Sequence, residues 1–94
     1  MAPTPEQTLV SFYRTSAGAE IDLVLEFAGL AEKWAIEIKS GYSARPGKGF
    51  YKALEDIEPE RSFVSYAGKE RYPISEGVEA INVLELARVL LEKG

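Results

Sequence analysis

Two stretches of the chain, Glu20-Ile-Asp-Leu-Val-Leu-Glu-Phe27 and Lys33-Trp-Ala-Ile-Glu-Ile-Lys39, alternate polar and apolar residues and decide the fold. Such alternation is typical of a strand with one buried face, and two such stretches in close succession predict a β-hairpin. With the turn over 28–32, the simplest register gives four pairs: Glu26 with Lys33, Val24 with Ala35, Asp22 with Glu37, and Glu20 with Lys39.

Strict alternation would place the apolar side chains of this hairpin on a single face, which we expect to be buried. The residues concerned are Ile21, Leu23, Leu25, Phe27, Trp34, Ile36 and Ile38. On this interpretation Trp34 packs in the core and is not a platform for stacking bases.

The third pair sets the carboxylates of Asp22 and Glu37 opposite each other, which destabilises a sheet unless something compensates. A divalent cation is the usual compensation, and Lys39 adds a positive group beside the acids. This is the layout of a metal-dependent phosphodiesterase site. Two alternatives stay open: the charges could form an ordinary solvated face, or a slip of two residues could pair Asp22 with Lys39 in a salt bridge.

The rest of the chain predicts an α/β domain with a central mixed sheet. Further strands are expected over Leu9 to Arg14, Arg61 to Tyr66 and Val78 to Ile81, with a polar turn region over 67–77. A helix is expected around 50–57, ended by Pro59, and a C-terminal helix capped by Asn82. A strand–helix–strand connection of this length favours parallel pairing with a right-handed crossover.

Length and composition suit one folded domain. The chain has 94 residues, of which 46% are hydrophobic, so we expect a single domain over 1–94, with a core over 10–91 and a loose lead-in over 1–8. Cysteine and histidine are absent, which excludes disulfides, the usual zinc sites and histidine-based catalysis. A metal would therefore be bound by oxygen, as Mg²⁺ or Mn²⁺ is. No apolar run approaches a membrane span, and we expect a cytoplasmic protein without membrane contact.

The chain is acidic overall, but its positive charges are concentrated in one segment. The formal net charge of −4 disfavours strong non-specific binding of nucleic acid. Between Ile38 and Leu54, however, the sequence has four cations and no acid: Lys39, Arg45, Lys48 and Lys52. This basic segment could face phosphate, although a solvated helix face would show the same pattern.

Two motifs resemble a known group of enzymes. Arg14-Thr-Ser-Ala-Gly-Ala-Glu-Ile-Asp22, followed by Ala35-Ile-Glu-Ile-Lys-Ser40, resembles the PD-(D/E)XK, or restriction-endonuclease-like, superfamily, which has an Asp on one strand and Glu-x-Lys on the next. Within it, the chain most resembles the C-terminal domain of unknown function that follows the ATPase module in archaeal and bacterial AAA-type ATPases. The Lys-Gly-Phe helix start at 48–50 and Ile-Asn-Val-Leu-Glu-Leu at 81–86 extend the similarity from about Val10 to Leu91.

The resemblance implies roles for particular residues. Asp22 and Glu37, with the backbone carbonyl of Ile38, would hold one Mg²⁺ against a scissile phosphate, and Lys39 would orient the attacking water or stabilise developing charge. Glu20 would join the outer surroundings of the ion or pair with Lys39. Residues that would contact nucleic acid are Arg14, Ser16, Lys48 and Lys52.

Two functions are compatible with these sequence features. The first is a Mg²⁺-dependent nuclease-like domain that hydrolyses phosphodiesters, with DNA as the expected substrate. The second is a catalytically silent C-terminal module of an AAA-type ATPase that serves assembly with the ATPase domain, homodimerisation or DNA docking. Active members of the superfamily often contribute another acid from a helix before the first strand, whereas here Glu6 is the only acid that precedes Glu20.

Overall fold

The computed structural model describes residues 8–27 and 32–93. The expected lead-in over 1–8 and the expected hairpin turn over 28–32 therefore lie outside the described residues, except that Thr8 begins β1 and Glu32 begins β3. The described residues form six strands and two helices. In chain order these are β1 (Thr8–Arg14), β2 (Glu20–Phe27), β3 (Glu32–Ile38), α1 (Lys48–Ile57), β4 (Arg61–Tyr66), β5 (Tyr72–Ser75), β6 (Val78–Asn82) and α2 (Val83–Lys93).

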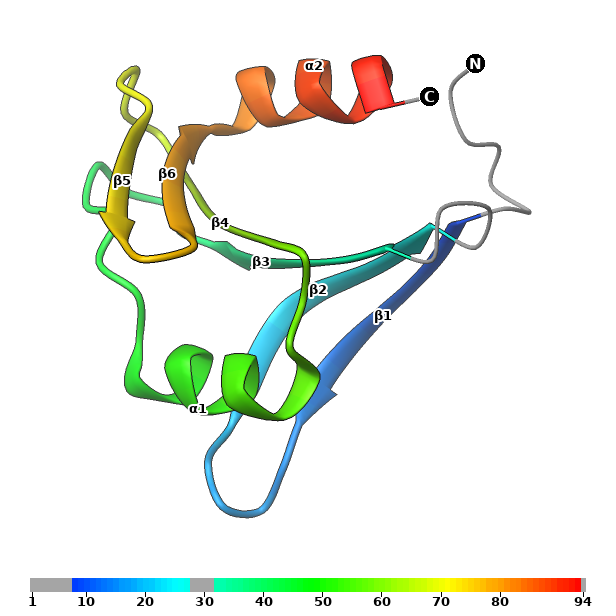
Figure 1. Ribbon diagram of the computed structural model, residues 1–94. Helices are drawn as coiled ribbons and strands as arrows, with labels where there is room; N and C mark the ends of the chain where they lie inside the picture. Colours follow the sequence, from blue (N-terminus) through cyan, green and yellow to red (C-terminus); the bar gives the residue numbers. More distant parts are fainter. Residues whose placement is uncertain (1–7, 28–31, 94) are drawn as a thin grey trace.

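The strands form one mixed sheet in the order β1-β2-β3-β4-β6-β5. Strands β3, β4 and β6 run parallel, and the other neighbours are antiparallel. Helix α1 lies on one side of the sheet and α2 on the other (Figure 1). Neither helix is long and apolar enough to cross a membrane, as judged over the described part of the chain.

Several predictions from the sequence are confirmed. The β2–β3 ladder pairs Val24 with Ala35 and Glu26 with Lys33, so the two-residue slip is wrong. The β3–α1–β4 connection joins parallel neighbours, as expected from its length. At the start of α2, the Leu84 N–H donates a hydrogen bond of 2.9 Å to Asn82 Oδ1, which is the expected N-cap.

The short strand β5 was not expected. Its four residues include Pro73, in a segment that the sequence indicated to be a polar turn. The strand lies at the end of the sheet and pairs with β6 alone. A proline is tolerated there because a strand at the sheet edge has one side without a partner strand, so its missing N–H need not interrupt a ladder.

A bulge in β2 corrects the expected division of faces. In the β1–β2 ladder Ser11 pairs with Val24 and Tyr13 with Ile21, so two residues of β2, Asp22 and Leu23, lie opposite the single residue between Ser11 and Tyr13. An extra residue in a strand reverses the faces to which the side chains on one side of the bulge point. The prediction that Ile21 shares a face with Leu23 is therefore wrong.

The sheet consequently buries apolar side chains on both faces. The α1 side holds a buried cluster that includes Ile21, Val24, Ala35, Phe50, Ala53, Val64 and Ala80. The α2 side holds a second buried cluster: Leu25, Phe27, Trp34, Ile36, Phe63, Ile81 and Leu86. Trp34 is fully buried, as predicted, whereas Ile38 was expected in the core and is 53% exposed. Helix α2 packs mainly on β4 and β6.

The start of α1 touches the turn between β1 and β2. A Cβ atom added at Gly49 would lie 2.4 Å from the carbonyl oxygen of Gly18. Gly18 itself has φ of +95°, a conformation that glycine adopts without strain. These two glycines let helix and turn approach at backbone distance, and the approach sets the position of α1 over the sheet.

We predict that Gly49→Ala destabilises the fold by about 1–2 kcal/mol. Alanine favours a helix by about 1 kcal/mol over glycine, but the added methyl group meets backbone, and overpacking of this kind costs about 1–3 kcal/mol. Urea denaturation measures the change. Gly41→Ala is the matched control because a Cβ at Gly41 meets nothing within 4 Å. Equal stability of the two variants would contradict the close approach.

Candidate functional site

The four charged residues expected around the metal ion line one cavity. It has a volume of about 250 Å³ and lies where β2, the carboxyl end of β3 and the amino end of α1 meet. Its lining residues are Glu20, Asp22, Glu37, Ile38, Lys39, Gly47, Gly49 and Phe50. We call this the carboxylate cavity.

Asp22 lies at the β2 bulge and lines the cavity. The β2–β3 ladder ends at Leu23 and Ile36, so the expected pairs of Asp22 with Glu37 and Glu20 with Lys39 are not part of it. Beyond that point Asp22 Oδ2 accepts a hydrogen bond of 2.8 Å from the Ile38 N–H. A side-chain carboxylate thus takes the place of a backbone carbonyl where the two strands separate.

Glu37 is held by the segment that leads into α1. Its two carboxylate oxygens lie 3.2 and 3.4 Å from the Gly47 N, which donates to them. The Lys39 ammonium lies 3.4 Å from Glu37 Oε2. The Glu37 side chain is 13% exposed and that of Lys39 is 35% exposed. Both charges therefore sit at the cavity in a fixed arrangement, with Lys39 the more accessible to solvent.

The backbone of Ile38 adds an oxygen to the same side. In an extended strand the N–H and C=O groups of one residue point toward the same neighbouring strand. Since the Ile38 N–H points to Asp22 on β2, its carbonyl oxygen also faces the gap between β2 and β3. Two carboxylates and a backbone carbonyl are thereby available at one end of the sheet.

This donor set suits a hard divalent cation. Mg²⁺ binds through one or two carboxylates and keeps several waters or phosphate oxygens as further ligands. Among residues 8–27 and 32–93 no group of three or more acidic side chains could hold an ion by itself. An ion at Asp22 and Glu37 would therefore complete its coordination with the Ile38 carbonyl, water and substrate oxygens.

Four residues expected to contact nucleic acid lie outside the lining of the cavity. Arg14 pairs with Glu20 at 3.1 Å, so Glu20 takes Arg14 as its partner instead of Lys39. Ser16 lies exposed in the turn after β1. Lys52 donates to the Ala17 carbonyl at 3.3 Å and thereby ties α1 to this turn. Lys48 is exposed at the start of α1.

The sequence did not indicate that Gly47 and Phe50 would line the cavity. Both lie in or next to the loop over 40–47, which has no periodicity that could fix its path. The signal that was available is the Lys-Gly-Phe start of α1. An N–H group near a helix start is a common partner for a carboxylate.

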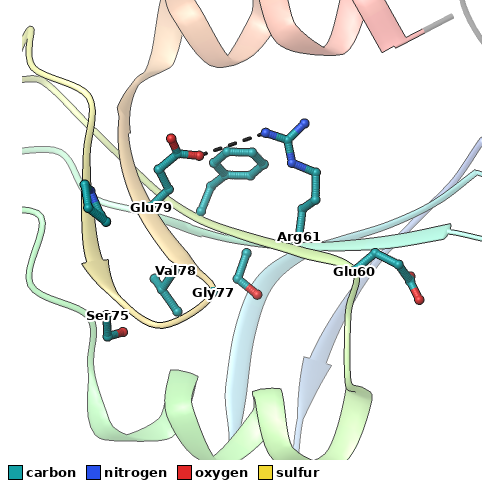
Figure 2. A pocket seen from close by; sticks show the side chains of 9 residues that line it. Glu60, Arg61, Ser75, Gly77, Val78 and Glu79 are labelled. Carbon is teal, nitrogen blue, oxygen red and sulfur yellow. Dashed lines mark ion pairs between the residues drawn. The ribbon is translucent and has the colours of Figure 1, made fainter.

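A second, larger cavity is lined by charged side chains that pair with one another. It measures about 430 Å³ and lies at the amino ends of β4 and β6, where Arg61 and Glu79 point toward each other (Figure 2). Arg61 lies 4.0 Å from Glu79 and also stacks over the Trp34 and Phe63 rings. Arg71 binds Glu79 at 2.8 Å, and this hydrogen bond raises the pKa of Arg71 above its ordinary value. These side chains satisfy one another and link β4, β5 and β6.

We predict that Asp22→Ala lowers the free energy of unfolding by about 1 kcal/mol, because the Ile38 N–H loses its acceptor. Asp22→Asn keeps a side-chain oxygen at the same position and is expected to change stability by less than about half as much. Urea denaturation in the absence of divalent cations measures the free energy of unfolding of both variants. Wild-type stability of Asp22→Ala would show that this hydrogen bond does not hold β2 to β3.

Comparison with known proteins assigns the chain to a family. Residues 2–86 match the domain of unknown function DUF4143. The chain is also 31% identical over 81 residues to the uncharacterized proteins Mb2031c of Mycobacterium bovis and Rv2008c of Mycobacterium tuberculosis. The alignment covers 86% of this chain and 17% of each relative, so the chain spans about a sixth of their length. No solved structure matches the chain significantly. On the match over residues 2–86, the chain belongs to the DUF4143 family.

Proposed function

We propose that the chain is a Mg²⁺- or Mn²⁺-dependent nuclease-like domain of the PD-(D/E)XK type, which hydrolyses phosphodiester bonds at the carboxylate cavity. The observation that carries the proposal is the meeting of Asp22, Glu37, Lys39 and the Ile38 backbone in one cavity. Two acids and a lysine that share a small cavity have a simple use in holding a cation against an anionic substrate.

Each residue has a role in the proposed reaction. Asp22 and Glu37 bind the cation, and the Ile38 carbonyl adds a third oxygen. The cation supplies Lewis acidity toward a phosphate oxygen. Lys39 orients the attacking water or neutralises charge that develops on the phosphate. The Gly47 N–H keeps Glu37 pointed at the cavity.

The expected test is a titration with Mg²⁺ followed by backbone amide NMR. Chemical-shift changes should concentrate at 20–22, 37–39 and Gly47, since these groups surround the proposed ion. Asp22→Asn and Glu37→Gln keep the side-chain shape and remove the charge, so they should abolish these changes. Uniformly small changes at millimolar Mg²⁺ would contradict the metal site.

Activity gives a second readout of the same proposal. With Mg²⁺ or Mn²⁺ the chain should nick supercoiled plasmid DNA, and Lys39→Met should lower the rate by about 10²-fold or more, the usual effect of losing a charge-stabilising group. Arg88→Met is the control, because Arg88 is an exposed cation on α2 and does not line the cavity. Equal rates for the two variants would remove Lys39 from the reaction.

A second candidate is the catalytically silent assembly module, and the β1 edge favours it. Strand β1 ends the sheet and pairs with β2 alone among the described strands. Leu9, Val10 and Phe12 are 61, 62 and 72% exposed, and the strand has no charge before Arg14. Exposed edges of this kind are normally protected by charge, and an unprotected edge is a template for pairing with another chain.

The proposed pairing joins two copies through β1. An antiparallel arrangement centred on Ser11 would set Val10 of one copy against Phe12 of the other, as a twofold axis requires. In a longer protein an ATPase domain could cover the same edge, since the matched segment is only 17% of the mycobacterial relatives.

We predict that the chain dimerises and that Val10→Lys gives a monomer with an unchanged free energy of unfolding at low protein concentration. A lysine on an edge strand opposes pairing and leaves the exposed site within the monomer undisturbed. Sedimentation equilibrium measures the molecular mass. Leu84→Lys, on the exposed surface of α2, is the control. A wild-type chain that stays monomeric at high concentration would remove this candidate.

A further inference from the structure

A second groove adjoins the carboxylate cavity and is lined by aromatic residues. It has a volume of about 470 Å³, and its walls include Tyr42, Arg45, Pro46, Tyr51, Tyr72 and Pro73. We propose that this tyrosine groove binds unpaired bases of a single-stranded nucleic acid whose backbone continues into the carboxylate cavity. The proposal deepens the nuclease function above and rests on it.

The three tyrosines are accessible. Tyr42, Tyr51 and Tyr72 are 82, 40 and 41% exposed. Aromatic rings at a surface are the feature that single-stranded nucleic-acid sites share, because every base has a flat face that can stack on them. Paired bases inside a duplex are already stacked and cannot use such rings.

Two of the rings are held in place by their neighbours. The Tyr51 hydroxyl lies 3.0 Å from Ser75 Oγ in a hydrogen bond. Tyr72 meets the buried Tyr66 ring in an edge contact, with centroids 6.3 Å apart and planes at 86°. Tyr66 in turn donates to the Glu70 carbonyl at 2.7 Å. Ordered rings lose little conformational freedom on binding, so their stacking contributes more fully to affinity.

The groove and the cavity are lined by neighbouring residues of the chain. Pro46 lines the groove and Gly47 lines the cavity, while Tyr51 lines the groove and Phe50 lines the cavity. Residues that are consecutive in the chain have Cα atoms about 3.8 Å apart. One extended strand of nucleic acid can therefore place bases in the groove while a phosphate nearby reaches Lys39.

The charge of these neighbouring residues favours a nucleic acid over a peptide. A groove of tyrosines and prolines is also the kind of surface that binds proline-rich peptides. Here, however, the segment from Lys39 to Lys52 contains four cations and no acid. Lys39 lines the cavity and Arg45 lines the groove, while Lys48 and Lys52 are exposed nearby in the chain. Such cations match a phosphodiester backbone, whereas a proline-rich peptide without acidic residues offers them no opposite charge.

The test measures binding of a fluorescein-labelled oligothymidine of about 12 nucleotides, a length within the usual span of such sites. Fluorescence anisotropy is recorded in EDTA, so that no cleavage occurs. We expect binding that weakens as salt rises, and weaker binding of a duplex of the same length. Tyr42→Ala and Tyr72→Ala should each weaken oligothymidine binding by about fivefold or more, while Tyr42→Phe, which keeps the ring, should not.

The control is Leu84→Ala, because Leu84 is an exposed apolar residue of α2 that lines neither the groove nor the cavity. Its oligothymidine affinity should equal that of the wild-type chain. Undiminished binding by both tyrosine-to-alanine variants would overturn the proposal. So would tighter binding of a proline-rich peptide that depends on the same tyrosines.

The test separates this proposal from the nuclease function. Tyrosine-dependent binding without a Mg²⁺ response at 20–22 and 37–39 would support the groove and remove the nuclease. A Mg²⁺ response without oligothymidine binding would support the metal site and overturn the groove.

Discussion

The hydrogen bond from the Ile38 N–H to Asp22 Oδ2 is the interaction on which the arrangement of the site depends. The β2–β3 ladder stops at Leu23 and Ile36, beside the bulge that β2 forms against β1, and a bulge bends the strand that contains it. Beyond that point the Asp22 carboxylate accepts the hydrogen bond of the Ile38 N–H. The acids and the lysine line the carboxylate cavity, which lies at this end of β3.

The sequence predicted much of the sheet, because alternation survives wherever strands pair regularly. The hairpin register followed from charge and apolar matches at Glu26 with Lys33 and at Val24 with Ala35. The bulge could not be predicted, since Ile21 and Leu23 are both apolar and both become buried or partly buried on opposite faces. Strand β5 could not be predicted for another reason: its four residues include a proline and show no periodic pattern.

The charged residues of the candidate site could be predicted from the sequence, whereas the backbone groups that hold them in place could not. Asp22 and Glu37 lie on strands and Lys39 directly follows β3, so their position follows from pattern and register. Gly47 comes from a loop, and its N–H contact with Glu37 depends on the path of the chain between β3 and α1. The tyrosine groove shows the same limit, because Tyr42, Tyr51 and Tyr72 come from three separate segments that only the folded sheet brings together.

The far end of α1 has a consequence for how the protein tolerates changes in chain length. Glu58 ends the helix in a left-handed conformation, with φ of 50°. Directly after it, the Glu60 N–H donates to the Lys33 carbonyl at 2.8 Å, and the Lys33 N–H donates to Glu60 Oε1 at 2.6 Å. This double clasp fixes the helix exit to the beginning of β3. We therefore expect insertions and deletions between β3 and β4 to fall within 40–47, a loop whose residues line both hollows. Length variation in this domain would reshape the ligand-facing surface while the sheet stays as it is.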